Sequence, residues 1–148
     1  MLKGISPLIS PDLLRVLCEL GHGDTIVFSD SNFPGNSIAK QNGAAFLRLD
    51  GQGMVPLLDA ILALFPLDEY VPHPVCYMQK EPRDKDVAVP ILDEYTKVVS
   101  RWDKRGGEAV LYLPRQDFYE ESKKAACVVQ TGETAIYANI ILQKGVVS

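Results

Sequence analysis

The sequence predicts an α/β fold with three layers, α/β/α, in which helices cover both faces of a mostly parallel or mixed central sheet. Strand-like apolar runs alternate with helix-like periodic segments over most of the chain. The run TIVF at 25–28 has the nearly continuous apolar character of a strand buried on both faces. The last two predicted strands have no helix between them, so we expect an antiparallel or mixed edge. The length of 148 residues suits a single domain, 1–148.

The first helix is expected at 11–20. Ser10 offers a hydroxyl cap, Pro11 suits the first helical position, and Asp12 lies near the positive end of the helix. Leucines recur at helical spacing along the segment, and Gly21 can end it in a left-handed turn.

The later elements follow from the same patterns. Further helices are expected at 53–65, 90–102 and 115–125, and Pro56 is expected in the first turn of the helix 53–65. The stretch 33–44 is predicted as a loop or a helix. Beyond 25–28, the expected strands are 45–49, 75–79, 109–113, 126–130 and 135–143. The charged stretch 80–86 is expected to be a surface connection.

Composition argues against several classes of protein. The net charge is −4 and the basic residues are scattered, which argues against binding of nucleic acid. The most apolar segment, 55–65, is interrupted by Asp59 and is shorter than the ~20 residues that span a bilayer. The first residues lack the pattern of a secretory signal. We therefore expect a cytoplasmic protein that does not enter a membrane.

The motifs of bound cofactors are missing. Cys18, Cys76 and Cys127 lack CxxC spacing and are expected to be reduced, small buried hydrophobes. His22 and His73 are the only histidines and form no HExxH motif, so no metal is expected. No phosphate loop and no GxGxxG motif opens a helix. The sequence therefore predicts no cofactor.

The stretch LGHGDTIVFSDSNFPG, 20–35, contains the first candidate site residues. Asp30 follows the strand 25–28, and ligands of open α/β sheets gather at the carboxyl ends of strands. His22 precedes that strand and should lie at its opposite end, unless the glycines fold the chain back or a neighbouring subunit completes the site. Histidine suits general acid/base catalysis near neutral pH. The alternatives are a helix-cap role for His22 and turn chemistry for Asp24 and Asp30.

Two further pairs have spacing that suits a site. Arg115 and Tyr119 lie four residues apart and share a helical face; the alternative is a buried tyrosine under an arginine. Tyr137 and Asn139 lie two apart, which on a strand puts both on one face, where a hydroxyl and an amide could bind ligand hydroxyl groups. The alternative is a polar sheet face.

Three segments resemble a known family: 6–34 with GHGD and S-D-x-x-F-P, 118–133 with F-Y-E-x-x-K-K-A and T-G-E, and 137–145 with Y-x-N. They are similar to the L-fucose mutarotase branch of the sugar mutarotase family, which also contains D-ribose pyranase. The resemblance implies a fold like that of RbsD and a cofactor-free isomerase of fucose metabolism. Such an enzyme interconverts the α and β anomers of L-fucose.

The resemblance also implies roles for single residues. His22 matches the proton donor, Tyr119 is the second candidate for proton transfer, and Asp30 matches a sugar-binding carboxylate. The remaining residues expected to bind the sugar are Asp68, Met78, Arg115, Tyr137 and Asn139. Ala138 stands where glycine is common, which would disturb a sugar contact if this position needs a positive φ.

Family members form homo-oligomers, commonly decamers, with pockets at subunit contacts, which would explain the position expected for His22. Two alternatives stay open. A D-ribose pyranase would not need an apolar contact at Met78, because ribose lacks the C6 methyl group of fucose. A non-catalytic sugar-binding subunit would not need His22 and Tyr119 as a proton-transfer pair.

Overall fold

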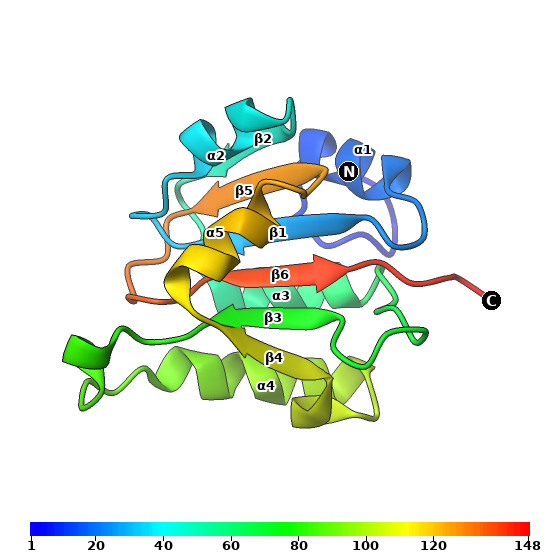
Figure 1. Ribbon diagram of the computed structural model, residues 1–148. Coiled ribbons are helices and arrows are strands. Elements are labelled where there is room, and N and C mark those ends of the chain that lie inside the picture. The colour runs from blue at the N-terminus through cyan, green and yellow to red at the C-terminus, as the bar shows by residue number, and fades with distance from the viewer.

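A six-stranded sheet forms the middle of the computed structural model, which describes residues 1–148 (Figure 1). The strands are β1 (Thr25–Ser29), β2 (Ala45–Leu49), β3 (Val75–Met78), β4 (Val110–Leu113), β5 (Cys127–Thr131) and β6 (Ile140–Gln143). Their order is β2-β5-β1-β6-β3-β4. Strand β6 runs antiparallel to both of its neighbours, whereas the other pairs are parallel. The predicted mixed sheet is confirmed.

The antiparallel strand is central, so the expectation of an antiparallel edge was wrong. Although β6 follows β5 in the chain, it pairs with β1 and β3 instead. Its residues Ile140, Ile141 and Leu142 are all buried. A continuous apolar run of this kind needs cover on both faces, which an edge position would not provide.

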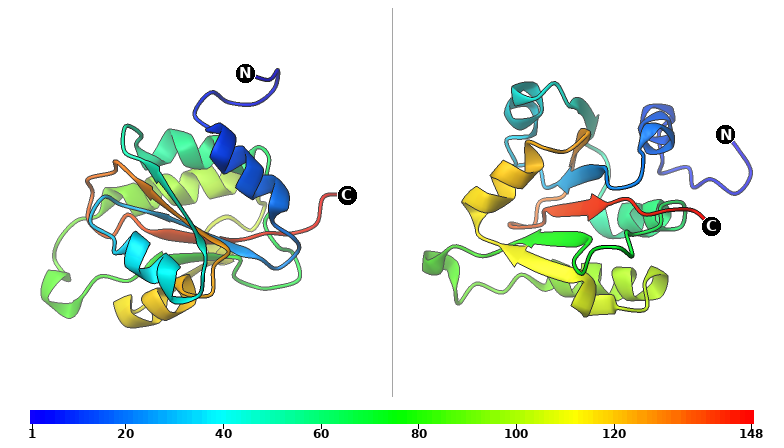
Figure 2. Two further views of the ribbon diagram at one scale, coloured as in Figure 1. Left: turned by 90° about the horizontal axis from the view of Figure 1, so that it is seen from above. Right: turned by 45° about the vertical axis from the view of Figure 1, so that its right-hand side comes forward.

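Helices cover both faces of the sheet, as the three-layer prediction requires (Figures 1 and 2). They are α1 (Pro11–Glu19), α2 (Gly35–Gln41), α3 (Met54–Leu62), α4 (Pro90–Trp102) and α5 (Arg115–Ser122), with short 3-10 turns η1 (Pro82–Asp84) and η2 (Gly106–Ala109). The larger hydrophobic core lies under α1, α3 and α4, and the smaller one lies under α2 and α5. None of these helices is long and apolar enough to span a membrane.

Local signals explain only some of the helix ends. A side-chain cap is present only at α1, and Gly21, expected to end that helix in a left-handed turn, does not have a positive φ. The Ser10 hydroxyl accepts a hydrogen bond from the Leu13 N–H at 3.2 Å, as predicted for a cap, and Pro56 lies in the first turn of α3. The stretch 33–44, predicted as a loop or a helix, contains α2.

Two segments differ from the prediction. The strand expected at 135–143 begins only at Ile140, because Tyr137 has a φ of 60° and belongs to a turn. The connection 80–86 contains η1 and contributes side chains to the candidate site described below.

The three cysteines differ in burial. Cys127 is fully buried and Cys76 partly buried, but Cys18 is exposed, so the expectation of three buried thiols was wrong for Cys18. Burial raises the pKa of the Cys127 thiol to about 12 and that of Cys76 to about 11.

Candidate active site

The GHGD turn displays His22 at the amino end of β1. Gly23 has a φ of 84°, a conformation that favours glycine, and its N–H donates to the Lys144 carbonyl at 2.8 Å. The Asp24 carboxylate accepts a hydrogen bond from the Gly21 N–H at 2.7 Å, so Asp24 has the turn role weighed as its alternative. The two glycines and Asp24 thus build a tight turn in which the imidazole stays about half exposed.

His22 is held by a buried carboxylate. Its Nε2 lies 3.1 Å from Oδ1 of Asp68; the His22 side chain is 48% exposed and that of Asp68 only 3%. Burial alone would raise the pKa of Asp68, but hydrogen bonds from the Tyr70 amide, His22 and Gln143 lower it overall. Because Asp68 is then ionised near neutral pH, Nε2 carries a hydrogen and Nδ1 is left for another partner. The helix-cap alternative for His22 does not describe this contact.

Asp30 forms the centre of a second polar cluster, at the carboxyl end of β1. Its Oδ2 accepts from the Asn139 side-chain amide at 3.1 Å, while its own N–H donates to Asn139 Oδ1 at 2.9 Å. Its Oδ1 accepts from the Asn32 N–H at 2.9 Å, which is the turn contact weighed as its alternative. Burial raises the pKa of Asp30 in spite of these donors. Donors from Asn139 and Asn32 thus fix a buried carboxylate at the end of the strand.

A surface cavity of about 360 Å³ opens beside this cluster. Six of the eight residues predicted for the site line it: Asp30, Met78, Arg115, Tyr119, Tyr137 and Asn139. Phe33 and Ile136 add apolar surface, and Asp84 adds a carboxylate. The structure therefore brings together residues from four separate segments of the sequence.

Tyr137 and Asn139 meet in the cavity through a turn, not through the shared strand face that the sequence predicted. The Tyr137 hydroxyl donates to Asp84 Oδ2 and accepts from the Glu81 N–H at 3.2 Å. Ala138 is not among the residues with positive φ, and its carbonyl accepts from the buried Tyr95 hydroxyl at 3.0 Å. The positive φ that a glycine would favour therefore belongs to Tyr137, so Ala138 carries no such strain.

Arg115 and Tyr119 share one face of α5, as predicted. The Arg115 guanidinium carbon lies 5.8 Å from the centre of the Tyr119 ring, and its Nε pairs with Glu81. The Tyr119 ring also packs edge-on against Phe33, with centres 5.5 Å apart. The arginine-over-tyrosine alternative and a role in lining the cavity are thus both compatible with the geometry.

His22 and Asp68 do not join the other six residues. They lie at the amino end of β1, and this five-residue strand, at ~3.3 Å per residue, puts roughly 16 Å between the two clusters. The opposite-end position predicted for His22 is confirmed. The pairing of Asp68 with His22 was not anticipated, because 46 residues separate the two.

Sequence reasoning missed several side chains around both clusters. Tyr70 lies beside His22, with ring centres 5.2 Å apart, and Gln143 donates to Asp68. Asp84 and Glu81 hold the Tyr137 hydroxyl from a stretch predicted to be only a connection. The D-x-Y spacing of an Asx turn at Asp68 could have indicated Tyr70, but the other contacts join distant segments.

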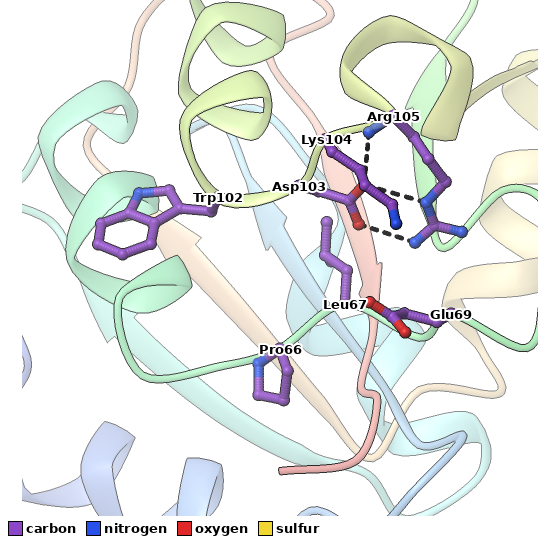
Figure 3. A pocket seen from close by; sticks show the side chains of 7 residues that line it. All are labelled: Pro66, Leu67, Glu69, Trp102, Asp103, Lys104 and Arg105. Carbon is purple, nitrogen blue, oxygen red and sulfur yellow. Dashed lines mark hydrogen bonds and ion pairs between the residues drawn. The ribbon is translucent and has the colours of Figure 1, made fainter. Parts of the chain in front are cut away.

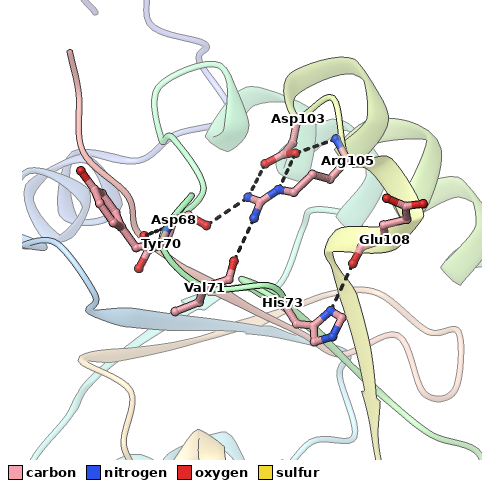
Figure 4. A network of polar contacts seen from close by, with 7 residues as sticks. All are labelled: Asp68, Tyr70, Val71, His73, Asp103, Arg105 and Glu108. Carbon is pink, nitrogen blue, oxygen red and sulfur yellow. Dashed lines mark hydrogen bonds and ion pairs between the residues drawn. The ribbon is translucent and has the colours of Figure 1, made fainter.

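Other predicted features lie outside both clusters. His73 is a loop residue, as expected, and its Nδ1 lies 3.1 Å from the Glu108 carbonyl oxygen (Figure 4). No group of three or more His, Cys, Asp or Glu side chains is arranged to hold a metal ion.

The chain matches the RbsD / FucU transport protein family over residues 3–147. The fucose mutarotase of Homo sapiens is 46% identical over 99% of this chain and 95% of its own length. FucU from Bifidobacterium longum has 51% identity and a TM-score of 0.94, covering 99% of this chain and 100% of its own. The fucose mutarotase of Streptococcus pneumoniae, solved in complex with L-fucose, has 45% identity and a TM-score of 0.90 over 99% and 100% of the two chains.

The match extends over both clusters, from the GHGD turn to the residues after β6. It also extends over the central antiparallel strand, since the solved relatives superpose on almost the whole chain. This protein is therefore a member of the RbsD/FucU family.

Proposed function

We propose that this protein is an isomerase that interconverts α-L-fucose and β-L-fucose. The observation that carries the proposal is the His22–Asp68 pair, a half-exposed imidazole fixed by a buried, ionised carboxylate. Relatives that are 45–46% identical over almost the whole chain bear the name fucose mutarotase, and one of them was solved with L-fucose. A protein that only bound sugar would not need an imidazole held in this way.

The chemistry needs two proton movements. Removing the proton from the anomeric hydroxyl while protonating the ring oxygen breaks the bond from C1 to the ring oxygen and gives the open-chain aldehyde. Rotation about the C1–C2 bond exposes the other carbonyl face, and the reverse transfers close the ring as the other anomer. His22 exchanges protons through Nδ1, because Asp68 occupies Nε2. Tyr119 is the second proton-transferring group, and its hydroxyl can donate a proton to the sugar.

The cavity near Asp30 supplies the sugar-binding part of this proposal. Asp30 and Asn139 offer a carboxylate and an amide to sugar hydroxyl groups, and Arg115 and Tyr137 line the same cavity. Met78 is buried, also lines this cavity and provides an apolar contact for a methyl group. L-Fucose carries such a methyl at C6 and D-ribose does not, which favours fucose over the pyranase alternative.

The separation of the two clusters supports a site shared between copies of the chain. In a cyclic homo-oligomer, for which we propose a decamer, His22 and Asp68 of one copy meet the Asp30 cavity of the next. Coexpressed His22→Ala and Asp30→Asn chains test this arrangement. Each variant alone should be inactive, but mixed assemblies contain some intact sites and regain part of the activity. A fully active monomer at low concentration would contradict shared sites.

Saturation-transfer NMR between the anomeric signals of L-fucose tests the activity itself, with D-ribose as the comparison. We expect enzyme-dependent exchange with L-fucose, and a loss of about a hundredfold in His22→Ala because general acid/base groups contribute at least this much. Absence of enzyme-dependent exchange with either sugar would refute the mutarotase function. Unchanged exchange in His22→Ala would refute the role of His22.

A further inference from the structure

Arg105 connects the end of α4 to the loop that carries Asp68. Its guanidinium donates to the backbone carbonyls of Asp68 at 3.0 Å and Val71 at 2.9 Å (Figure 4). The same group forms a two-pronged ion pair with Asp103, at 2.7 Å and 3.0 Å. The side chains are only 22% and 10% exposed, which favours a fixed geometry over a fluctuating surface pair.

On the side that faces Arg105, no helix or strand ladder holds the loop 66–71. Its other side is tied to β6 and the residues after it: the Asp68 N–H donates to the Gln143 carbonyl, and the Gly145 N–H donates to the Pro66 carbonyl. The carbonyls of Asp68 and Val71 have Arg105 as their side-chain donor. The position of the Asp68 backbone, and with it the carboxylate at His22, thus depends on contacts from both sides.

Asp103 keeps Arg105 in this orientation. Its Oδ1 accepts from both the N–H and the Nε of Arg105. The Arg105 guanidinium beside Asp103 holds the pKa of that carboxyl below its usual value, so the ion pair persists at neutral and mildly acidic pH. Lysine could keep the charge at this position, but its single ammonium cannot reproduce the planar fork that serves both carbonyls and Asp103.

We propose that Arg105 is a positioning residue for sugar mutarotation, because its contacts to the loop 66–71 hold Asp68 in hydrogen-bond range of His22. Arg105 acts through Asp68 and does not touch the imidazole. The proposal rests on the function proposed above, since it assigns Arg105 to the proton-transfer half of that site.

A surface cavity of about 490 Å³ gives access to Arg105 from outside. Arg105 and Asp103 form one wall of it, and Leu67 and Trp102 form others (Figure 3). In Arg105→Ala, a small guanidinium compound can enter from this cavity and occupy the vacated place beside Asp103. This access makes chemical rescue a practical test.

The experiment compares Arg105→Lys and Arg105→Ala with Arg101→Ala. Arg101 lies in the last turn of α4, four residues before Arg105, and forms a surface pair with Asp59 at 3.3 Å and no hydrogen bond to the loop 66–71, so it controls for the loss of one charge. For L-fucose we expect kcat to fall about tenfold in Arg105→Lys and further in Arg105→Ala, with KM changed less than about twofold. Arg101→Ala should match the parent. Methylguanidinium at a non-denaturing concentration should raise kcat of Arg105→Ala only.

A second measurement does not depend on activity. The nitrogen chemical shifts of the His22 ring report which nitrogen carries the hydrogen, and we expect the Nε2–H form of the parent to be lost in Arg105→Ala and partly kept in Arg105→Lys. If Arg105→Ala fails to fold, Arg105→Lys carries both measurements. Parent-like kcat and parent-like His22 signals in the Arg105 variants would overturn the proposal. If the parent protein itself does not exchange fucose anomers, the proposed function fails, and the His22 signals still decide whether Arg105 positions Asp68.

Discussion

Replacing Tyr95 with phenylalanine removes one buried hydroxyl and tests how the turn that lines the cavity is held. Tyr95 lies on α4 and is fully buried, and its hydroxyl donates to the Ala138 carbonyl at 3.0 Å. Ala138 is fully buried as well, so water cannot replace the lost donor. The turn also contains Tyr137 at a φ of 60°, a conformation that costs energy for a residue with a side chain.

The expected cost follows from the unpaired carbonyl. Leaving one buried acceptor without a partner costs about 1–3 kcal/mol in the free energy of unfolding. For a chain of this length, that cost lowers Tm by roughly 3–10 °C. Tyr112→Phe is the matched control, because this tyrosine is half exposed and its removed hydroxyl leaves no buried acceptor without a partner. We expect the control to change stability by less than about 0.5 kcal/mol.

Urea unfolding, followed through the fluorescence of the single tryptophan, Trp102, measures both variants. L-Fucose exchange measured on the same samples should show a raised KM in Tyr95→Phe, since the displaced turn carries Tyr137 and Asn139. Equal unfolding midpoints for Tyr95→Phe and Tyr112→Phe would refute the argument that the hydroxyl supports the turn. An unchanged KM would refute its link to the cavity.

Three further predictions concern other parts of the chain. Because folding lowers the pKa of Asp68, its ionised carboxylate stabilises the folded state above the unfolded pKa of ~3.9, and this stabilisation is lost as the pH falls through the folded pKa. Asp68→Asn should therefore lose less stability on acidification than the parent. Urea midpoints of the two proteins that change in parallel with pH would contradict this. Gly132→Ala would place a Cβ 1.9 Å from the Asp50 carbonyl oxygen. We expect either insoluble protein or a decrease of more than about 3 kcal/mol in the free energy of unfolding, and expression yield and thermal unfolding check this. Iodoacetamide should label Cys18 in the native protein and leave Cys127 unmodified by mass spectrometry; equal labelling would refute the burial of Cys127.

Elements with local signals could be predicted from the sequence with little error. The helix expected at 90–102 is found at Pro90–Trp102, because a proline marks its start and a broad apolar face defines its length. The strand 45–49 is found at Ala45–Leu49. The place of β6 in the sheet could not be predicted in this way, since its register with β1 joins residues more than 100 positions apart.

For the candidate site too, only the features that depend on local spacing could be predicted from the sequence. The position of Asp30 at a strand end and the shared face of Arg115 and Tyr119 depend on local spacing, and both predictions hold. The contact of Asp68 with His22 and the hydrogen bond from Arg105 to the Asp68 carbonyl depend on how distant segments pack. No periodicity in the sequence encodes such contacts.

Strand β6 links the two clusters because it is antiparallel to its neighbours. Asn139, just before its start, lies at the carboxyl end of β1 and holds Asp30. Gln143, at its end, is paired in register with Thr25 at the amino end and holds Asp68. One short strand thus fixes the two clusters at opposite ends, and His22 does not reach across it to the Asp30 cavity. Two different ends of the molecule must then meet in the proposed shared site, and a head-to-tail contact of this kind closes into a ring when its rotation permits.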